Sequence, residues 1–513
     1  RVRDTLYVTD NSGQKITAPE KQRALRATTV LTKHFTHLLP HSPNPETAIL
    51  HFRELLGQLV GRPNWPDELA SLERPEVLDA LARLLGVSDF LWDDFLRMQY
   101  SNLFPVVRDV DELTAAHSQT ELRAALASAL QAAPDFATRR EALNAFKDRE
   151  MFRIDMRNIL GHITQFGQFS AELTDLAEVV VDAALEMCLA ELQARYGAPL
   201  LADGRPCPVC VCGLGKCGGR ELGFASDIEL MFIFAGSGRT TGVSVGHEPA
   251  APPQSEGSQP ASAGGVISTA EFYEKLVQEF IATIRARREG IFEIDLQLRP
   301  YGSAGSMAVS LDAFRRYFAP GGPAWPYERQ ALVKLRPIAG DRQLGEHIVA
   351  LRDQYVYGGE PFDPTAMRAM RERQTRHLVT PGTFNAKFSP GGLVDLEYIV
   401  QGLQITYGAA NPALRQTNTG QALIALAEAG VLSQDHYQQL RQALIFLRRL
   451  INALRMVRGN ARDLTVPPAD SEEFAFLARR LGYEDDTARL RQDLTRHTSQ
   501  VQELSYQLLR SPA

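Results

Sequence analysis

The sequence predicts an α+β fold that is predominantly helical, in which a small mixed sheet lies between two helical regions. In the regions before residue 166 and after residue 345, apolar residues recur at steps of three and four, as in helices with one buried face. Between these regions, short apolar runs bounded by glycines have the length and alternation of β-strands. We therefore expect three domains, with boundaries at 1–165, 166–345 and 346–513.

The helical elements are expected where the apolar stripe is strongest. One helix is predicted to begin at Ser170, a favourable N-cap, and to end near Gly197, with a buried stripe along Leu173, Leu176, Val180, Ala184 and Met187. The other expected helices span 75–85, 269–288, 423–432 and 437–456, and the last two are separated by a turn short enough for an antiparallel pair.

Three strands are expected in the middle of the chain. The runs 208–212 and 228–234 are apolar, and 291–298 alternates, so that Phe292, Ile294, Leu296 and Leu298 share one face. The stretch from Gly236 to Gly265 is rich in Gly, Ser and Pro, which indicates a flexible surface insertion within the α/β domain.

Composition excludes several classes of protein. With 513 residues, a net charge of -6 and a pI of about 6.1, the chain is not expected to bind nucleic acid electrostatically. It contains no apolar run of the ~18 residues that a membrane helix needs. Five cysteines in a chain of this size fit a reducing cytoplasm. Four of them form C-x2-C-x-C-x4-C, but a strand places Cys210 and Cys212 on one face, so we interpret them as buried apolar residues rather than zinc ligands.

Three carboxylates carry the chemistry that the sequence predicts. Asp227 and Glu229 are two residues apart at a strand, so both point to one face, and Asp295 lies on the polar face of another strand. Taken alone, such acids are more often a solvated strand face. Brought together, they would offer the hard oxygen ligands that two Mg2+ ions prefer. Two such ions can activate an attacking hydroxyl and stabilise a leaving pyrophosphate.

A glycine-rich turn, Gly213-Leu-Gly-Lys-Cys-Gly-Gly219, directly precedes the acids and favours a phosphate-binding role. It matches the dinucleotide fingerprint literally, but the next strand begins by Ile228, which leaves no room for the crossover helix of that fold. It is not a P-loop either, because neither Ser nor Thr follows Lys216. Farther on, Arg299 follows the third acid and could pair with phosphate oxygens.

The stretch from Gly213 to Phe234 resembles the signature of glutamine synthetase adenylyltransferases, the bifunctional adenylylating and adenylyl-removing enzymes, whose catalytic modules belong to the polymerase-beta-like nucleotidyltransferase superfamily. Four further blocks are similar to this family and occur in its order, at 293–302, 328–341, 391–401 and 446–455. The resemblance covers roughly residues 100 to 510. It implies that the α/β domain is a nucleotidyltransferase domain.

The resemblance also implies the roles of single residues. Asp227, Glu229 and Asp295 would bind the metals and carry catalysis, and the nucleotide contacts would come from Gly213, Gly215, Lys216, Ser226 and Arg299. The substrates would be ATP and a tyrosine of glutamine synthetase, with a PII-type signalling protein as a candidate partner. The roles of Glu328 and Lys334, in a matching block, stay open between the site and a structural ion-pair network.

The chain departs from the family pattern at several positions. Glu229 stands where Asp is usual, Gln297 stands where Arg is common, and two residues separate Trp325 from Glu328. Family members carry two catalytic modules and this chain has one, so it is either half of a larger protein or a one-module relative. Its ending resembles the C-terminal, adenylylating module. Three functions therefore stay open: adenylylation, phosphorolytic removal of AMP, and a non-catalytic regulatory or scaffolding role.

The C-terminal helical region is expected to select the protein partner and to do no chemistry, because a rigid bundle offers an extended surface. Its Asp395 and Glu397 follow Gly391-Gly392, and we interpret them mainly as the negatively charged start of a helix. A direct catalytic role for this pair is the alternative.

Overall fold

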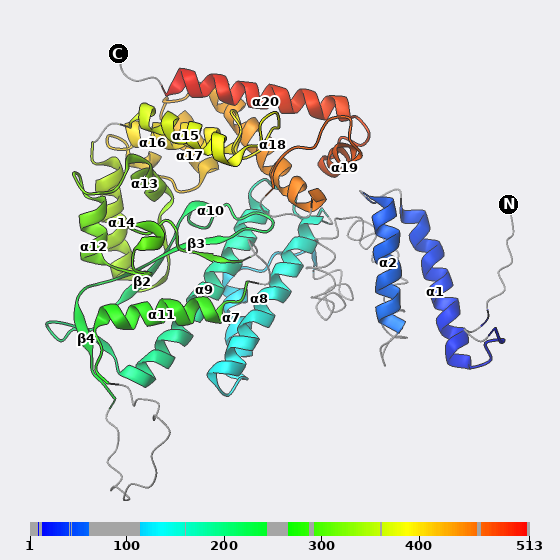
Figure 1. The fold of residues 1–513 in the computed structure, drawn as a ribbon, viewed down its shortest axis with the longest axis horizontal. Helices are drawn as coiled ribbons and strands as arrows, with labels where there is room; N and C mark the ends of the chain where they lie inside the picture. Colours follow the sequence, from blue (N-terminus) through cyan, green and yellow to red (C-terminus); the bar gives the residue numbers. More distant parts are fainter. Residues whose placement is uncertain are drawn as a thin grey trace, which may run out of the picture.

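The computed structural model describes residues 9, 13–39, 42, 44–60, 113–159, 161–243, 265–286, 292–359, 362–458 and 463–509. The helix expected at 75–85 lies outside these ranges. Figure 1 shows a small sheet flanked by helices, with a helical bundle from the last third of the chain packed beside it. The α+β class, predominantly helical, is confirmed.

A five-stranded mixed sheet forms the centre of the α/β domain. Its order is β5-β3-β2-β7, with β6 also paired to β3. The strand β3 runs antiparallel to β2 and parallel to β5 and β6, while β7 is antiparallel to β2. The strands are β2 (Val209–Gly213), β3 (Ile228–Phe234), β5 (Ile294–Asp295), β6 (Ala308–Ser310) and β7 (Arg336–Gly340).

The two faces of the sheet are both buried, because the alternating side chains of β2 and β3 enter two different cores. Val211 and Phe232 pack with the helices α8 (Phe136–Ile159), α9 (Gln168–Tyr196) and α11 (Thr269–Thr283). Cys210, Cys212 and Met231 pack on the opposite face with α12 (Leu311–Phe318) and α14 (Arg342–Tyr357). All five cysteines are free and buried, as expected for apolar packing.

Two predicted helices of this domain have their apolar stripes buried as expected. In α9 these are Leu173, Leu176, Val180, Ala184 and Met187, and in α11 they are Phe272, Leu276 and Phe280, followed by the buried C-cap residue Ile284. The helix α9 ends at Tyr196 with Gly197 as its C-cap, close to the predicted end. It begins at Gln168, two residues before the predicted Ser170, whose carbonyl lies inside the first turn and accepts from the Thr174 hydroxyl. The helix α11 ends at Thr283 instead of residue 288.

Two strand predictions need correction. The segment 291–298 forms only the two-residue strand β5, because residues 296–300 turn away from the sheet, and this turn leaves Leu298 exposed instead of buried. The segment 236–265 is not irregular from its start: Gly238–Thr240 forms β4, which pairs with β1 (Pro199–Leu201). The backbone groups of this short segment are paired with those of β1, so the start of the predicted insertion is a strand and not a flexible loop.

The remaining helices form the two flanking regions. At the N-terminal side, α1 (Pro19–Leu38) packs on α2 (Pro45–Val60) through the stacked rings of Phe35 and Phe52, and α7 (Gln119–Gln131) packs on α8. The C-terminal region has its own core and comprises α15 (Pro364–Leu378), α16 (Leu393–Tyr407), α17 (Thr419–Glu428), α18 (Gln434–Arg458), α19 (Glu472–Leu481) and α20 (Thr487–Leu508). The expected helix pair is α17 and α18, which contact each other. Within the described ranges, no helix has the length and apolar character needed to cross a bilayer.

Candidate active site

The three predicted acids lie at one end of the pair formed by β3 and β5. Glu229 and Asp295 are register partners on these two parallel strands, and Asp227 is the residue directly before β3. Side chains opposite each other in paired strands lie on the same face. The structure therefore places the three residues at the same end of this strand pair.

The glycine turn packs directly against Glu229. It folds into the short helix α10 (Gly215–Gly218), where Gly215 has a φ of +47°. A Cβ atom at Gly215 would lie 1.7 Å from Glu229 Oε2, so another residue would require the Glu229 carboxylate to move and would also strain the backbone at this positive φ. The backbone N–H of Lys216 donates to Glu229 Oε2 at 2.8 Å. One amide of the turn is thus held by an acid of the site itself.

Lys216 contacts the acids through its side chain as well. Its Nζ lies 2.5 Å from Asp227 Oδ1, and both side chains are partly exposed. Burial would raise the pKa of Asp227, but the charge of Lys216 lowers it below the ordinary value. The predicted phosphate contact is therefore an ion-pair partner of the first acid in this structure.

The other two acids have raised pKa values. Burial raises the pKa of Glu229, and the neighbouring negative charge of Asp227 raises it further. The pKa of Asp295 is raised by burial first, and then by Asp227 and Glu293. The negative charge of Asp227 thus raises the pKa of both neighbouring acids, which marks an excess of negative charge in a small volume.

This excess fits a hard divalent cation, since carboxylates are its preferred ligands and its charge would relieve their repulsion. Within the described ranges, however, no three His, Cys, Asp or Glu side chains form a ready-made cage for a metal ion. The Nζ of Lys216 now supplies the counter-charge. The donor types fit Mg2+, and Asp227 also pairs with Lys216.

Ser226, a predicted nucleotide contact, shapes the loop that presents Asp227. Its Oγ accepts from the Gly223 N–H at 3.0 Å, and its side chain is buried. Two residues of α18 bind the backbone of the same loop. Asn452 Oδ1 accepts from the Phe224 N–H at 3.3 Å, and Arg455 donates to the Phe224 carbonyl. A helix of the C-terminal region therefore holds the loop that enters β3.

Arg299 and Gly213 are built into the surrounding backbone. The guanidinium of Arg299 donates to the carbonyls of Leu296 at 2.7 Å, Ser306 at 3.1 Å and Gly305 at 3.2 Å. It closes the turn that follows β5. Gly213 ends β2, opposite Leu230 of β3. A phosphate contact from either residue stays a prediction.

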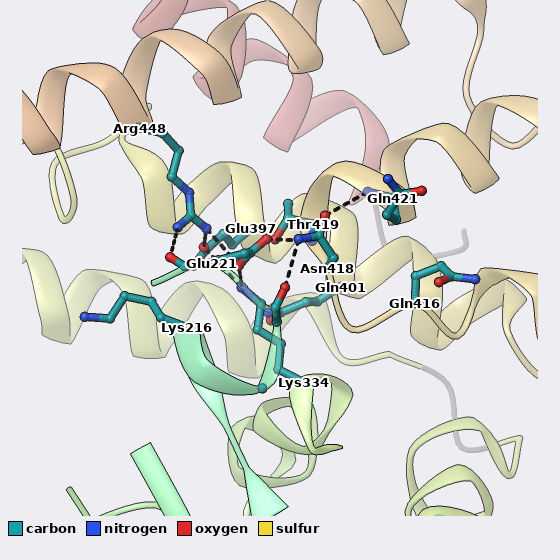
Figure 2. A network of polar contacts seen from close by, with 12 residues as sticks. Lys216, Glu221, Lys334, Glu397, Gln401, Gln416, Asn418, Thr419, Gln421 and Arg448 are labelled. Atoms are coloured by element: carbon teal, nitrogen blue, oxygen red, sulfur yellow. Dashed lines mark hydrogen bonds and ion pairs between the residues drawn. The ribbon is translucent and has the colours of Figure 1, made fainter. Parts of the chain in front are cut away.

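A buried ion-pair network lies behind the glycine turn (Figure 2). Glu221 pairs with Lys334 at 2.5 Å and with Arg448 at 2.8 Å, while Glu397 pairs with the same two cations at 3.2 and 2.8 Å. Its carboxylates and cations come from both the α/β domain and the C-terminal helices. The backbone N–H of Thr419 also donates to Glu221 Oε1 at 2.7 Å.

The network connects to the active site through the glycine turn, because the Glu221 N–H donates to the Lys216 carbonyl at 2.7 Å. Burial by itself would raise the pKa of Glu221, but the charges of Arg448 and Lys334 hold it well below its ordinary value of 4.5. Of the two open roles for Lys334, this geometry gives it a buried pairing role next to the site.

The remaining residues of the matching blocks are placed at helix starts. Glu328 accepts from the Trp325 N–H at 2.8 Å and from the Tyr317 hydroxyl at 2.8 Å, at the start of α13 (Pro326–Ala331). Asp395, in the first turn of α16, accepts from the Gly391 N–H at 2.7 Å and from Arg371 at 2.6 Å. The helix-start interpretation of Asp395 fits these contacts, whereas Glu397 belongs to the ion-pair network.

Sequence reasoning missed two cations of the site. The charge of Lys387 lowers the pKa of Asp227 and of Lys216, and Arg455 also lowers the pKa of Lys216. Burial lowers the pKa of Arg455 itself to about 10, although the charge of Asp227 opposes this. Both residues come from the C-terminal helical region. The family-like block at 446–455 was the one signal that pointed to Arg455.

The profiles of two protein families match parts of this chain. The profile of the glutamate-ammonia ligase adenylyltransferase family matches residues 78–252 and 250–350, which includes the glycine turn and all three acids. The profile of the GlnD PII-uridylyltransferase family matches residues 365–509, the C-terminal helices.

Several curated relatives carry the same name, bifunctional glutamine synthetase adenylyltransferase/adenylyl-removing enzyme. The protein of Thioalkalivibrio sulfidiphilus is 32% identical over 76% of this chain and 38% of its own length. Those of Pasteurella multocida and Shewanella loihica are 30% and 28% identical, over 82% and 84% of this chain and 40% and 42% of their own lengths. The chain thus spans about two-fifths of the length of these relatives. Because the family profile covers more than half of the residues, including the whole carboxylate site, the chain belongs to the glutamate-ammonia ligase adenylyltransferase family.

Proposed function

We propose that this chain transfers AMP from ATP to a tyrosine hydroxyl of glutamine synthetase. The observation that carries the proposal is the meeting of Asp227, Glu229 and Asp295 beside a glycine turn in a chain of this family. In the reaction, the tyrosine oxygen forms a bond to the α-phosphorus of ATP and the bond to the bridging oxygen of the β-phosphate breaks. Pyrophosphate leaves, and the hydroxyl proton passes to water.

The three acids are the proposed holders of two Mg2+ ions, which when bound supply the positive charge that neutralises the triphosphate and activates the hydroxyl. Lys216, whose Nζ pairs with Asp227, would be available to a phosphate oxygen if a cation were bound at Asp227. Gly213, Gly215, Ser226 and Arg299 stay proposed nucleotide contacts. Glu229, one methylene longer than the usual Asp, must release the Lys216 amide before a phosphate can use it.

The C-terminal helices are proposed to recognise the protein partner. Their similarity to a PII-uridylyltransferase family supports a PII-type signalling protein as a regulator. The structure changes one part of this view: α18 also holds the loop before Asp227 and brings Arg455 toward it. The bundle therefore supports the site as well as any partner surface. We place the chain in the cytoplasm, where glutamine synthetase and ATP are available.

Incubation with labelled nucleotide tests the proposal and its direction. The chain is mixed with Mg2+ and α-32P-ATP plus unmodified glutamine synthetase, or with inorganic phosphate plus adenylylated glutamine synthetase. Label appearing on the unmodified enzyme supports the adenylylating reaction. Loss of AMP from the modified enzyme with release of ADP identifies the adenylyl-removing reaction, which the relatives' shared name includes. No reaction with either form indicates the regulatory or scaffolding role.

A further inference from the structure

A cavity of about 280 Å³ lies between α18, α19 and α20, outside the carboxylate site. Its lining includes Phe446 and Arg449 of α18, Tyr483 after α19, and Arg496 and His497 of α20. Small-molecule pockets usually begin at ~300 Å³, so this cavity suits a small metabolite and not a nucleotide.

His497 forms the buried wall of the cavity, with an exposed fraction of 5%. Its ring packs on Phe446 with a centroid distance of 4.8 Å, and its Nε2 lies 3.2 Å from Arg496 Nη2. A guanidinium can only donate, so Nε2 must be the acceptor of this hydrogen bond. The proton of the neutral ring is therefore on Nδ1.

The Nδ1–H of His497 is a buried donor that meets no acceptor among the described residues. Burial lowers the pKa of His497, and the charge of Arg496 lowers it further while Asp493 opposes the change, which agrees with the neutral ring. A buried donor without a partner costs ~1–3 kcal/mol, so a ligand oxygen at this position would be stabilising.

Two arginines that line the cavity, Arg449 and Arg496, offer donors to an anion. Arg449 donates through Nη2 to the Leu481 carbonyl at 3.1 Å. A guanidinium has five N–H groups, so this bond uses only part of its donor capacity. Arg496 pairs with Asp493 at 2.8 Å, and Asp493 also accepts from the Tyr483 hydroxyl at 2.7 Å. Arg489 adds a further positive charge, 5.8 Å from the centroid of the Tyr483 ring. The acids Glu484, Asp485 and Asp486 follow Tyr483 in the chain, so an anion would be held by the two lining arginines and not by a net positive charge.

We propose that this cavity, the α18–α20 pocket, binds a small anion whose carboxylate or phosphate oxygen accepts from His497 Nδ1 and pairs with Arg449 and Arg496. The inference does not rest on the AMP-transfer proposal. The pocket shares a helix with the active-site loop, since Arg449 lies in the same turn of α18 as Arg448 and Asn452.

The test is a titration of the full chain, labelled with 15N-histidine and observed by NMR at the His497 ring, whose signal is assigned by its loss in His497→Phe. The probes are sodium phosphate and sodium succinate, each compared with sodium chloride at equal ionic strength. Because the signal is local, phosphate that binds at the AMP-transfer site does not contribute.

We expect a saturable shift of the Nδ1 signal with phosphate, succinate or both, and the responding probe identifies the anion class. Arg496→Gln and Arg449→Gln should each weaken binding about 10-fold, as loss of a charge-assisted hydrogen bond does. The matched control is Arg491→Gln, which removes an exposed arginine of α20 outside the pocket and should leave the affinity unchanged. Absence of a shift beyond that with chloride, or equal affinity in all three arginine variants, would overturn the proposal.

Discussion

At the scale of single residues, the contact between Gly215 and Glu229 determines how the glycine turn meets the acids. The Glu229 carboxylate reaches the Lys216 amide, and the missing side chain at Gly215 leaves room for it. An aspartate, one methylene shorter, would not extend as far. The longer side chain at position 229, where the family usually has Asp, thus accounts for the hydrogen bond between the acid and the glycine turn.

Gly215→Ala is expected to lower AMP transfer at least about 100-fold, because its Cβ would displace the Glu229 carboxylate from its position beside the Lys216 amide. The matched control is Gly430→Ala. Gly430 has a φ of +72°, compared with +47° at Gly215, but no atom lies within 4 Å of its Cβ position, so this variant reports the backbone strain alone. Steady-state rates and melting temperatures of both variants give the comparison. Equal activity of the two would refute the steric argument.

Part of the site was predictable from single residues. The two-residue spacing of Asp227 and Glu229 fixed their common face, and the polar face of the next strand located Asp295. The ion pair of Lys216 with Asp227 was not predictable, because a turn lysine reaches either a phosphate or an acid. The charges of Lys387 and Arg455 come from more than 150 residues along the chain, and no local pattern indicates such long-range contacts.

At the scale of elements, β4 limits how much of the predicted insertion is dispensable. Thr240 and Ile267 exchange hydrogen bonds, N–H to O=C at 2.9 Å and N–H to Oγ1 at 3.1 Å, so the chain ends on either side of 244–264 lie close together. Strands β2 and β3 were predictable because both faces are buried and, apart from Glu229, their runs are apolar. The strand β5 was overestimated, because Arg299 binds backbone carbonyls and holds residues 296–306 in turns.

Replacement of residues 244–264 by a four-residue Gly-Ser linker is expected to change the melting temperature by less than about 2 °C, since loop length affects stability weakly. A deletion that extends through Gly238–Thr240 should lower it by more than about 5 °C, because it removes the pairing of β4 with β1. Thermal unfolding of the two variants checks both values. Equal melting temperatures would contradict the boundary drawn at β4.

At the scale of the whole molecule, the buried network joins the α/β domain to the C-terminal bundle. Glu221 of the α/β domain pairs with Arg448, and Lys334 of the same domain pairs with Glu397. The buried charges of each part are therefore paired in part by residues of the other. Hydrophobic periodicity predicted both parts but not this junction, because pairing between distant charges has no period. The helical region is consequently more than a recognition surface.

Glu221→Gln is expected to lower the free energy of unfolding by about 3 kcal/mol at pH 7, because it leaves buried cations under-compensated. Since the folded-state pKa of Glu221 is held below 4.5, its stabilisation is present above pH 4.5 and is lost as the pH falls below that value. The difference from the parent protein should therefore shrink in acid. Urea unfolding between about pH 7 and pH 3.5 measures it.

The matched control is Glu346→Gln, which breaks the exposed pair of Glu346 with Arg342 and should cost less than about 1 kcal/mol. A loss at Glu221 no larger than at Glu346, or one that grows as the pH falls, would show that the network does not stabilise the junction.

The central claim is that Asp227, Glu229 and Asp295 transfer AMP, and its most direct test compares Asp227→Asn with the parent protein. The assay measures label moved to glutamine synthetase from α-32P-ATP and from γ-32P-ATP, with Mg2+ present. Asp203→Asn, which alters an exposed acid paired with Arg205, is the control. We predict transfer of the α-label only, a loss of at least about 100-fold in Asp227→Asn, and a melting temperature within about 2 °C of the parent. Transfer of the γ-label, or an Asp227→Asn variant as active as Asp203→Asn, would contradict the account.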